Sequence, residues 1–154
     1  MPVLSLSLLI AAAAAGGPAL PAADRAAAFR AAGAKLRART WMLCPENPQS
    51  EGARVETVRD LNGDGRPEAV LMEDGSYCYG FTGIGFALVS KQANGSWKLM
   101  RSGTGIPEFL KTKGAGGWPD MAIGGPGFCF PVERWDGRDY IRVRYEYQGK
   151  RCRP

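Results

Sequence analysis

The fold of this chain is decided by residues 86–101, which read FALVSKQANGSWKLMR. Two runs with the composition of β-strands, Phe86 to Gln92 and Ser96 to Arg101, flank the dipeptide Asn94-Gly95. That dipeptide is preferred in the two-residue type I′ turn of a β-hairpin. The stretch therefore predicts an antiparallel hairpin and, with it, a mainly antiparallel sheet.

A second hairpin is predicted downstream, where Phe128 to Trp135 and Arg138 to Tyr147 flank Asp136-Gly137. Side chains alternate between the two faces of a strand. The face of the last strand that is expected to lie in the core carries Ile141, Val143, Tyr145 and Tyr147. The face that is expected to meet solvent or a partner carries Arg142, Arg144 and Glu146.

A third hairpin is predicted from Arg54 to Val58 and Glu68 to Met72, with a polar loop at its tip that reads DLNGDGRPE (residues 60–68). The loop places oxygen-bearing side chains at alternate positions, then a glycine, then a second acid. Calcium prefers about six to eight oxygen ligands from carboxylates, amides and backbone carbonyls. An ordinary polar β-turn is the alternative, because Asn-Gly and Asp-Gly are strong turn dipeptides. The expected calcium ligands are Asp60, Asn62, Asp64, the Arg66 carbonyl and Glu68.

The loop and the run Ala69 to Met72 resemble the calcium loop of integrin-alpha-type (FG-GAP or VCBS-like) repeats. The resemblance implies one structural calcium ion that braces a β-hairpin. The loop differs from that of an EF-hand, whose closing glutamate would fall where this chain has Leu71. Only one such loop is present, so a complete propeller built from these repeats is not expected.

Upstream of these strands, Asp24 to Thr40 is predicted to form a helix, with Phe29 and Leu36 on the face that docks on the sheet. Glycine and proline are abundant, at 21 and 11 residues, which favours short strands and turns. The segment from Gly103 to Gly127 is expected to be mostly loop. The predicted fold class is α+β and mainly β, with an N-terminal helix packed on an antiparallel sheet of short hairpins.

Residues 1–23 have the composition of a secretory signal peptide, with an apolar run followed by small residues and prolines. The apolar run is too short to cross a bilayer, which takes about 20 residues of helix. Residues 24–154 are expected to form a single disulfide-bonded, mainly-β domain. Cleavage is expected after Ala15, Ala19 or Ala23. We therefore predict a periplasmic or secreted protein without a transmembrane span.

Four cysteines are present, and none lies close enough to another for a Cys-x-x-Cys motif. Behind an export signal, an even number of cysteines predicts two disulfides. Three pairings are possible, and the sequence does not choose between them. The cysteines are Cys44, Cys78, Cys129 and Cys152.

Histidine is absent, which removes the most common general base and the catalytic arrangements that depend on it. A pair of carboxylates could still hydrolyse a glycan. No acid stands out by its context, so no catalytic residue is predicted. The candidates for such a pair are Glu73, Asp74, Glu108, Asp120 and Glu133.

The formal net charge of +5 favours acidic partners, and export makes nucleic acid the least expected of them. The predicted hairpin of residues 128–147 carries several arginines, which could form an anion-binding face. A tryptophan in a glycine-rich segment could stack on a partner. The expected partner surface consists of Trp118, Arg134, Arg138, Arg142 and Arg144.

These observations predict an exported, monomeric, non-enzymatic binding module with one structural calcium ion. Its partner would be an acidic envelope polymer, or an envelope protein that it binds or inhibits. Two alternatives stay open: a carboxylate-based hydrolase of an envelope glycan, and a purely structural envelope protein.

Overall fold

The computed structural model describes residues 19–154. The predicted signal peptide spans residues 1–23, and its first 18 residues lie outside the described part. Within the described part, no helix is long and apolar enough to cross a membrane.

The start of the described chain belongs to the folded domain. Leu20 packs against a buried core, and the first helix begins at Ala22. Cleavage after Ala15 or Ala19 would keep both residues, whereas cleavage after Ala23 would remove them. The signal peptide and its cleavage position stay predictions.

Residues 19–154 are mostly β-structure, with eleven strands and one helix longer than a single turn. The helical segments are α1 (Ala22–Ala31), the single turn α2 (Ser76–Tyr79) and the 3-10 turns η1 (Gly80–Thr82) and η2 (Ala115–Gly117). The first six strands are β1 (Lys35–Arg37), β2 (Thr40–Met42), β3 (Arg54–Arg59), β4 (Glu68–Asp74), β5 (Ile84–Lys91) and β6 (Trp97–Thr104). The others are β7 (Ile106–Lys113), β8 (Pro119–Gly124), β9 (Phe130–Trp135), β10 (Tyr140–Tyr147) and β11 (Lys150–Arg151).

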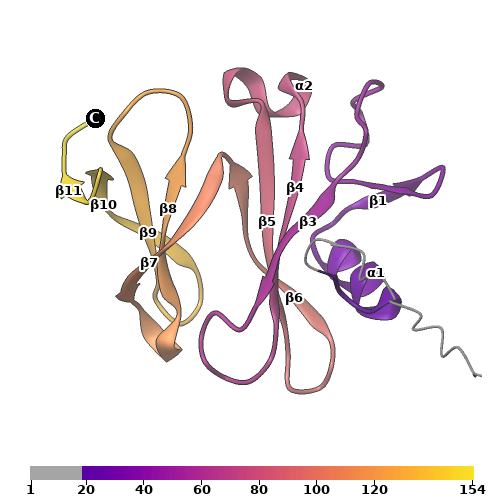
Figure 1. Ribbon diagram of the computed structural model, residues 1–154, viewed down its shortest axis with the longest axis horizontal. Coiled ribbons are helices and arrows are strands. Elements are labelled where there is room, and N and C mark those ends of the chain that lie inside the picture. The colour runs from indigo at the N-terminus through magenta and orange to yellow at the C-terminus, as the bar shows by residue number, and fades with distance from the viewer. Residues whose placement is uncertain (1–18) are drawn as a thin grey trace, which may run out of the picture.

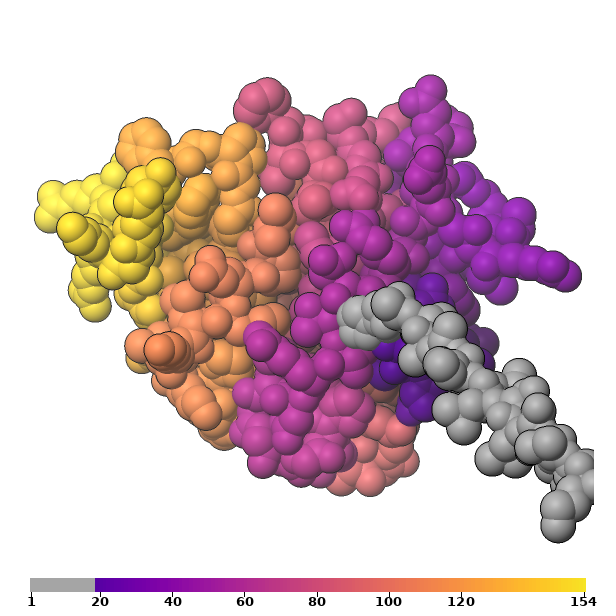
Figure 2. All heavy atoms as spheres, in the orientation of Figure 1, coloured from indigo at the N-terminus to yellow at the C-terminus, as the bar shows by residue number. Residues whose placement is uncertain are grey.

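The strands form three antiparallel sheets (Figure 1). The first sheet has the order β3-β4-β5-β6, the second sheet has the order β11-β10-β9-β8-β7, and β1 pairs with β2 alone. The predicted α+β fold, a helix packed on a single antiparallel sheet, is therefore wrong. The chain builds a second sheet of five strands, and helix contributes little to the structure. In the space-filling view α1 and the C-terminal strands lie at opposite ends of the molecule (Figure 2).

The first sheet lies between two buried clusters, because successive residues of β4 and β5 point to opposite faces. Burying a Leu or Phe side chain contributes about 1.5–3 kcal/mol, so both clusters hold the layers together. The cluster on the α1 side contains Ala28, Phe29, Ala69, Leu71, Ala87 and Val89. The cluster between the two sheets contains Val70, Met72, Phe86, Leu88, Met121, Trp135 and Tyr140.

Helix α1 is shorter than the predicted span of Asp24 to Thr40. It ends before Gly33, whose φ of 78° is left-handed. The Gly33 amide donates to the Arg30 carbonyl at 2.9 Å, and the Ala34 amide donates to the Phe29 carbonyl at 3.0 Å. This pair of bonds is the usual glycine cap of a helix C-terminus. The remainder of the predicted helix forms the β1–β2 hairpin.

The second sheet begins in a segment that was expected to be mostly loop. The chain passes from β6 to β7 through Gly105, whose φ is 126°. A Cβ at Gly105 would lie 2.6 Å from the carbonyl oxygen of Gly124 and 2.6 Å from Cγ2 of Ile123. Only glycine permits this bend, which redirects the chain from the first sheet into the second.

The hairpin predicted for residues 86–101 is confirmed, because β5 pairs with β6 in antiparallel register. Its turn differs from the predicted type I′, which needs positive φ at both central residues. Gly95 has a φ of 83°, and Asn94 is not in the positive region. The Gly95 amide donates to the Gln92 carbonyl at 2.9 Å, and the Gln92 amide donates to Ser96 at 2.8 Å. These bonds close a longer turn with glycine at its end.

The β9–β10 hairpin is also confirmed, but a register shift between Arg142 and Arg144 interrupts its alternation. A β-bulge of this kind moves the residues beyond it to the opposite face. The predicted core face of this strand is wrong already before the shift, because Tyr140 is buried in the core and its neighbour Ile141 is exposed. The exposed members of the predicted set are Ile141, Val143 and Tyr147.

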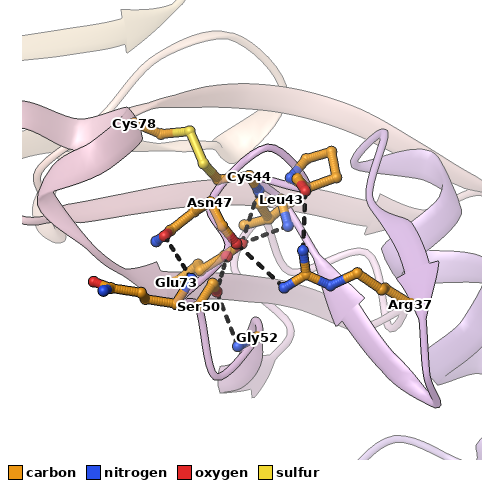
Figure 3. Close-up of a disulfide and its surroundings, with 10 residues drawn as sticks. Arg37, Leu43, Cys44, Asn47, Ser50, Gly52, Glu73 and Cys78 are labelled. Carbon is orange, nitrogen blue, oxygen red and sulfur yellow. Dashed lines mark hydrogen bonds between the residues drawn. A yellow bond between two sulfur atoms is a disulfide. The ribbon is translucent and has the colours of Figure 1, made fainter.

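Both predicted disulfides are present in the described residues, where no cysteine is free. The structure selects one of the three pairings that the sequence left open. One bond joins Cys44 to Cys78 and ties the segment after β2 to α2 (Figure 3). The other joins Cys129 to Cys152 and ties the start of β9 to the segment after β11.

Candidate metal centre

The loop between β3 and β4 is wrapped around the Asp60 carboxylate. Its Oδ1 accepts the amides of Gly63 at 2.7 Å and Asp64 at 3.2 Å, and its Oδ2 accepts the amide of Gly65 at 2.8 Å. Both glycines have a φ of 81°, which this tight reversal requires. The hydrogen bond from Gly65, with those from Gly63 and Asp64, lowers the pKa of Asp60. A charged carboxylate is therefore held at the centre of the loop.

Asn62 and Asp64 line the same turn. Asn62 Oδ1 accepts the Asp64 amide at 3.0 Å, and Asp64 Oδ1 accepts the Arg66 amide at 2.8 Å. Asp64 Oδ2 accepts the Asn62 amide group at 3.2 Å and forms an ion pair with the Arg66 guanidinium at 2.6 Å. This pair is partly exposed, and exposed pairs of this kind contribute about 0–1 kcal/mol. Arg66 is therefore a weak competitor for a cation at Asp64.

Glu68 ends the loop at the start of β4 and is 1% exposed. Its carboxylate accepts the Leu61 amide at 2.7 Å and the Ser90 hydroxyl at 2.8 Å. Burial raises the pKa of Glu68. The geometry gives Glu68 a bracing role, tying the loop to β5, and its role as a cation ligand stays a prediction.

The loop also contacts the η2 turn, which joins β7 to β8 within the second sheet. A Cβ on Gly117 of η2 would lie 2.8 Å from the Asn62 carbonyl oxygen, so the two backbones meet at close range. Leu61 packs against the cluster between the two sheets. An ordered loop therefore helps to fix the packing of one sheet on the other.

The donor set of the loop fits a hard cation in its chemistry. Asp60, Asn62 and Asp64 present carboxylate and amide oxygens around one turn, and calcium takes such oxygens. In residues 19–154, the three acidic or cysteine side chains whose ligand atoms lie within 4.8 Å of one another are those of Cys44, Glu46 and Cys78. The carboxylates of the loop lie further apart than this. Both sulfurs of that group are in a disulfide, so neither is available as a thiolate ligand.

The predicted partner surface is divided by the structure. Trp118 is 6% exposed and packs in the core, with its ring 5.9 Å from that of Trp135. It does not form part of a partner surface, because its apolar neighbours bury it. Arg138 is exposed, and Arg142 lies over the Tyr145 ring at 5.2 Å.

Arg134 and Arg144, the other predicted members, converge on Asp120 of β8. Asp120 accepts Arg134 Nε at 2.9 Å, Arg144 Nη1 at 2.8 Å and the Thr112 hydroxyl at 2.6 Å. Burial would raise the pKa of Asp120, but the hydrogen bonds from Arg134, Thr112 and Arg144 hold it well below its usual range. The sequence predicted these arginines and this acid separately and missed that they meet.

The other candidate acids for hydrolysis are also engaged in the fold. Glu73 is fully buried and accepts the amides of Leu43 at 2.5 Å and Cys44 at 2.9 Å, together with the Ser50 hydroxyl (Figure 3). Glu133 forms a two-point ion pair with Arg101 of β6, with contacts of 2.7 and 2.8 Å. Both carboxylates are therefore engaged with donors inside the protein, and the carboxylate-based hydrolase stays an untested alternative.

Two open pockets each contain two acids. One has a volume of about 940 Å³ and lies between the segment after β2 and the start of α2, with Glu51 and Asp74 in its lining. Asp74 forms an ion pair with Arg54 at 2.5 Å. Glu108, the remaining candidate, lies on β7 and lines the other pocket together with Glu56. Asp74 and Glu108 therefore line separate pockets.

No protein-family model, curated protein or solved structure matches this chain. The resemblance to integrin-alpha-type calcium loops therefore stays a prediction that rests on residues 60–72.

Proposed function

We propose that this chain is an exported, non-enzymatic binding module whose β3–β4 loop takes one structural calcium ion. The ion would be held by Asp60, Asn62, Asp64 and the Arg66 carbonyl, and its charge would order the loop. Export is supported by the two disulfides, since such bonds persist in oxidising compartments. The chain would act as a monomer.

The observation that carries this proposal is the ring of hydrogen bonds around Asp60. Three backbone amides converge on its carboxylate, and the next two alternate side chains, Asn62 and Asp64, each accept a further amide. These bonds curl the loop so that its oxygen-bearing side chains follow one turn, as a calcium loop requires. An ordinary β-turn needs fewer of these oxygens.

A structural role for the ion is supported by the neighbours of the loop. Residues 19–154 contain no histidine, and the loop adjoins no nucleophile that a metal could activate. The contacts of Leu61 and Asn62 instead link the loop to both sheets. Calcium would therefore act by stabilising the packing of the first sheet on the second.

A binding role is favoured over hydrolysis by the state of the acids. Asp120, Glu73 and Glu133 are each paired or hydrogen-bonded inside the protein. A glycosidase needs two carboxylates about 5–10 Å apart that are free to exchange protons in a cleft. The net charge of +5 supports an acidic envelope polymer or protein as the partner, and export makes nucleic acid the least expected one.

Calorimetric titration of calcium into the chelator-treated protein tests the proposal. We expect one binding event per chain, which Asp60→Asn and Asp64→Asn abolish. Asp136→Asn is the matched control, because Asp136 also accepts two amides, from Arg138 and Asp139, in a β-turn without alternate oxygens. The proposal fails if the wild type gives no heat of binding, or if all three variants bind calcium as the wild type does.

A further inference from the structure

The end of the molecule that carries β10 and β11 (Figure 1) has both aromatic and basic side chains among its exposed residues. Phe128 is 72% exposed and Tyr147 is 42% exposed, and their rings meet edge to face at 6.3 Å. Three exposed cations follow on β11 and just beyond it. This basic aromatic end is defined here as Phe128, Tyr147, Lys150, Arg151 and Arg153.

The Cys129–Cys152 disulfide holds these side chains in one place. It lies directly beside Phe128 and between two of the arginines in sequence. The Cys152 amide also donates to the Tyr145 carbonyl at 3.1 Å, and Tyr147 pairs with Lys150 across the β10–β11 ladder. Aromatic and basic groups are thus presented by a braced segment.

A pocket of about 490 Å³ opens on this end between β10 and the segment after β11. Arg151, Arg153 and Arg144 supply its charged lining, and Tyr145 and Val143 contribute apolar surface. Guanidinium groups present several N–H donors in a planar fork that matches phosphate oxygens. The pocket therefore has the chemistry of a site for a phosphoryl group.

The positive charge of this end is not neutralised by the protein. Arg144 is paired with Asp120 and Glu146. In contrast, Lys150, Arg151 and Arg153 form no ion pair within residues 19–154. Three unpaired cations beside exposed aromatic rings match a surface that is anionic outside and apolar beneath.

We propose that the basic aromatic end docks on an anionic phospholipid surface. Arg151 and Arg153 receive the headgroup phosphate at the pocket, Lys150 adds long-range attraction, and Phe128 and Tyr147 enter the boundary between headgroups and acyl chains. The inference goes beyond the proposed partner, an acidic polymer or protein, and it rests on the proposed export for access to a membrane surface.

Co-sedimentation with vesicles tests this proposal on the full folded chain. The vesicles contain either phosphatidylcholine alone or equal parts of phosphatidylcholine and phosphatidylglycerol. We expect binding only to the anionic vesicles, weakened by salt. The triple variant Lys150→Gln, Arg151→Gln, Arg153→Gln should bind about a hundredfold more weakly, since each basic residue near an anionic surface contributes roughly fivefold.

A second triple variant, Lys98→Gln, Lys111→Gln, Lys113→Gln, removes the same charge from exposed positions elsewhere and should lose less than about fivefold. Phe128→Ser should weaken binding, whereas Phe81→Ser, on the exposed η1 turn, should not. The proposal is overturned if the wild type does not bind anionic vesicles, binds both kinds of vesicle equally, or binds soluble polyphosphate but no vesicle. It is also overturned if the second triple variant loses as much vesicle affinity as the first. Each assay runs with calcium and with chelator, so a failure of lipid docking is distinguished from a failure of the calcium loop.

Discussion

The β3–β4 loop and the Asp120 network on the second sheet are both built around one aspartate, but they differ in where its partners come from. Asp60 accepts amides that lie three to five residues further along the chain. Asp120 accepts side chains that are 8, 14 and 24 residues away, from β7, β9 and β10. The loop could therefore be predicted from a short motif, whereas the network depends on strands that had to be placed first.

The two aspartates also differ in burial, which decides the cost of removing them. Asp120 is fully buried, and its charge is compensated by Arg134 and Arg144. Asp60 is exposed and solvent screens it. We expect the network to dominate the stability of the metal-free protein and the loop to respond to calcium.

The largest effect is expected from Asp120→Ala. The substitution leaves Arg134 and Arg144 without their shared partner, and removing one member of a buried ion pair costs about 3–5 kcal/mol. Urea unfolding of the variant and of Asp60→Ala, both in chelator, measures the difference. Equal losses of stability in the two variants would contradict the contrast between the two regions.

A somewhat smaller effect is expected from removing the Cys129–Cys152 disulfide, which closes a separation of 23 residues. In the chain-entropy model a loop of this size contributes about 3 kcal/mol. The double variant Cys129→Ser, Cys152→Ser should lose this amount in urea unfolding. Calcium should stabilise that variant as much as it stabilises the wild type. The reason is that the disulfide belongs to the second sheet, next to β9 and β11, whereas the loop joins β3 to β4 in the first sheet.

The dependence of stability on pH sharpens the comparison further. The pKa values of Asp120 and Asp60 are both lowered from the ordinary 3.8. A carboxylate with a lowered pKa stabilises the fold above its unfolded pKa, and the contribution is lost as the pH falls through the folded pKa. The stability gap between the wild type and Asp120→Asn should therefore be full at neutral pH and shrink below about pH 4. Asp60→Asn should show the same sign with a smaller gap, and a gap that widens in acid would contradict both assignments.

The parts of the fold that could be predicted from the sequence are those with local causes. Asp136-Gly137 marked the β9–β10 turn, Asn94-Gly95 marked the β5–β6 turn, and alternate oxygens marked the loop at Asp60. The glycine cap at Gly33 was also a local signal, and it was overlooked because the apolar spacing continued past it.

The parts that could not be predicted depend on long-range contacts. The role of Gly105 becomes clear only when its nearest neighbours, Ile123 and Gly124, are placed against it on β8. The bulge at Arg142 moved the later residues of β10 to the other face, and no residue type announces such a shift. The convergence of Arg134 and Arg144 on Asp120 likewise depends on how β8, β9 and β10 are placed side by side.

The measurement that tests the central claim most directly is the thermal unfolding of the wild type in calcium and in chelator. With calcium about a hundredfold above its Kd, the linkage relation gives about 2.7 kcal/mol, which raises Tm by roughly 5–10 °C for a domain of this size. Asp64→Ala should abolish the difference between the two conditions, while Asp136→Ala should lower Tm equally in both. A wild-type Tm that is the same in calcium and in chelator would contradict the account and leave the loop as a polar turn.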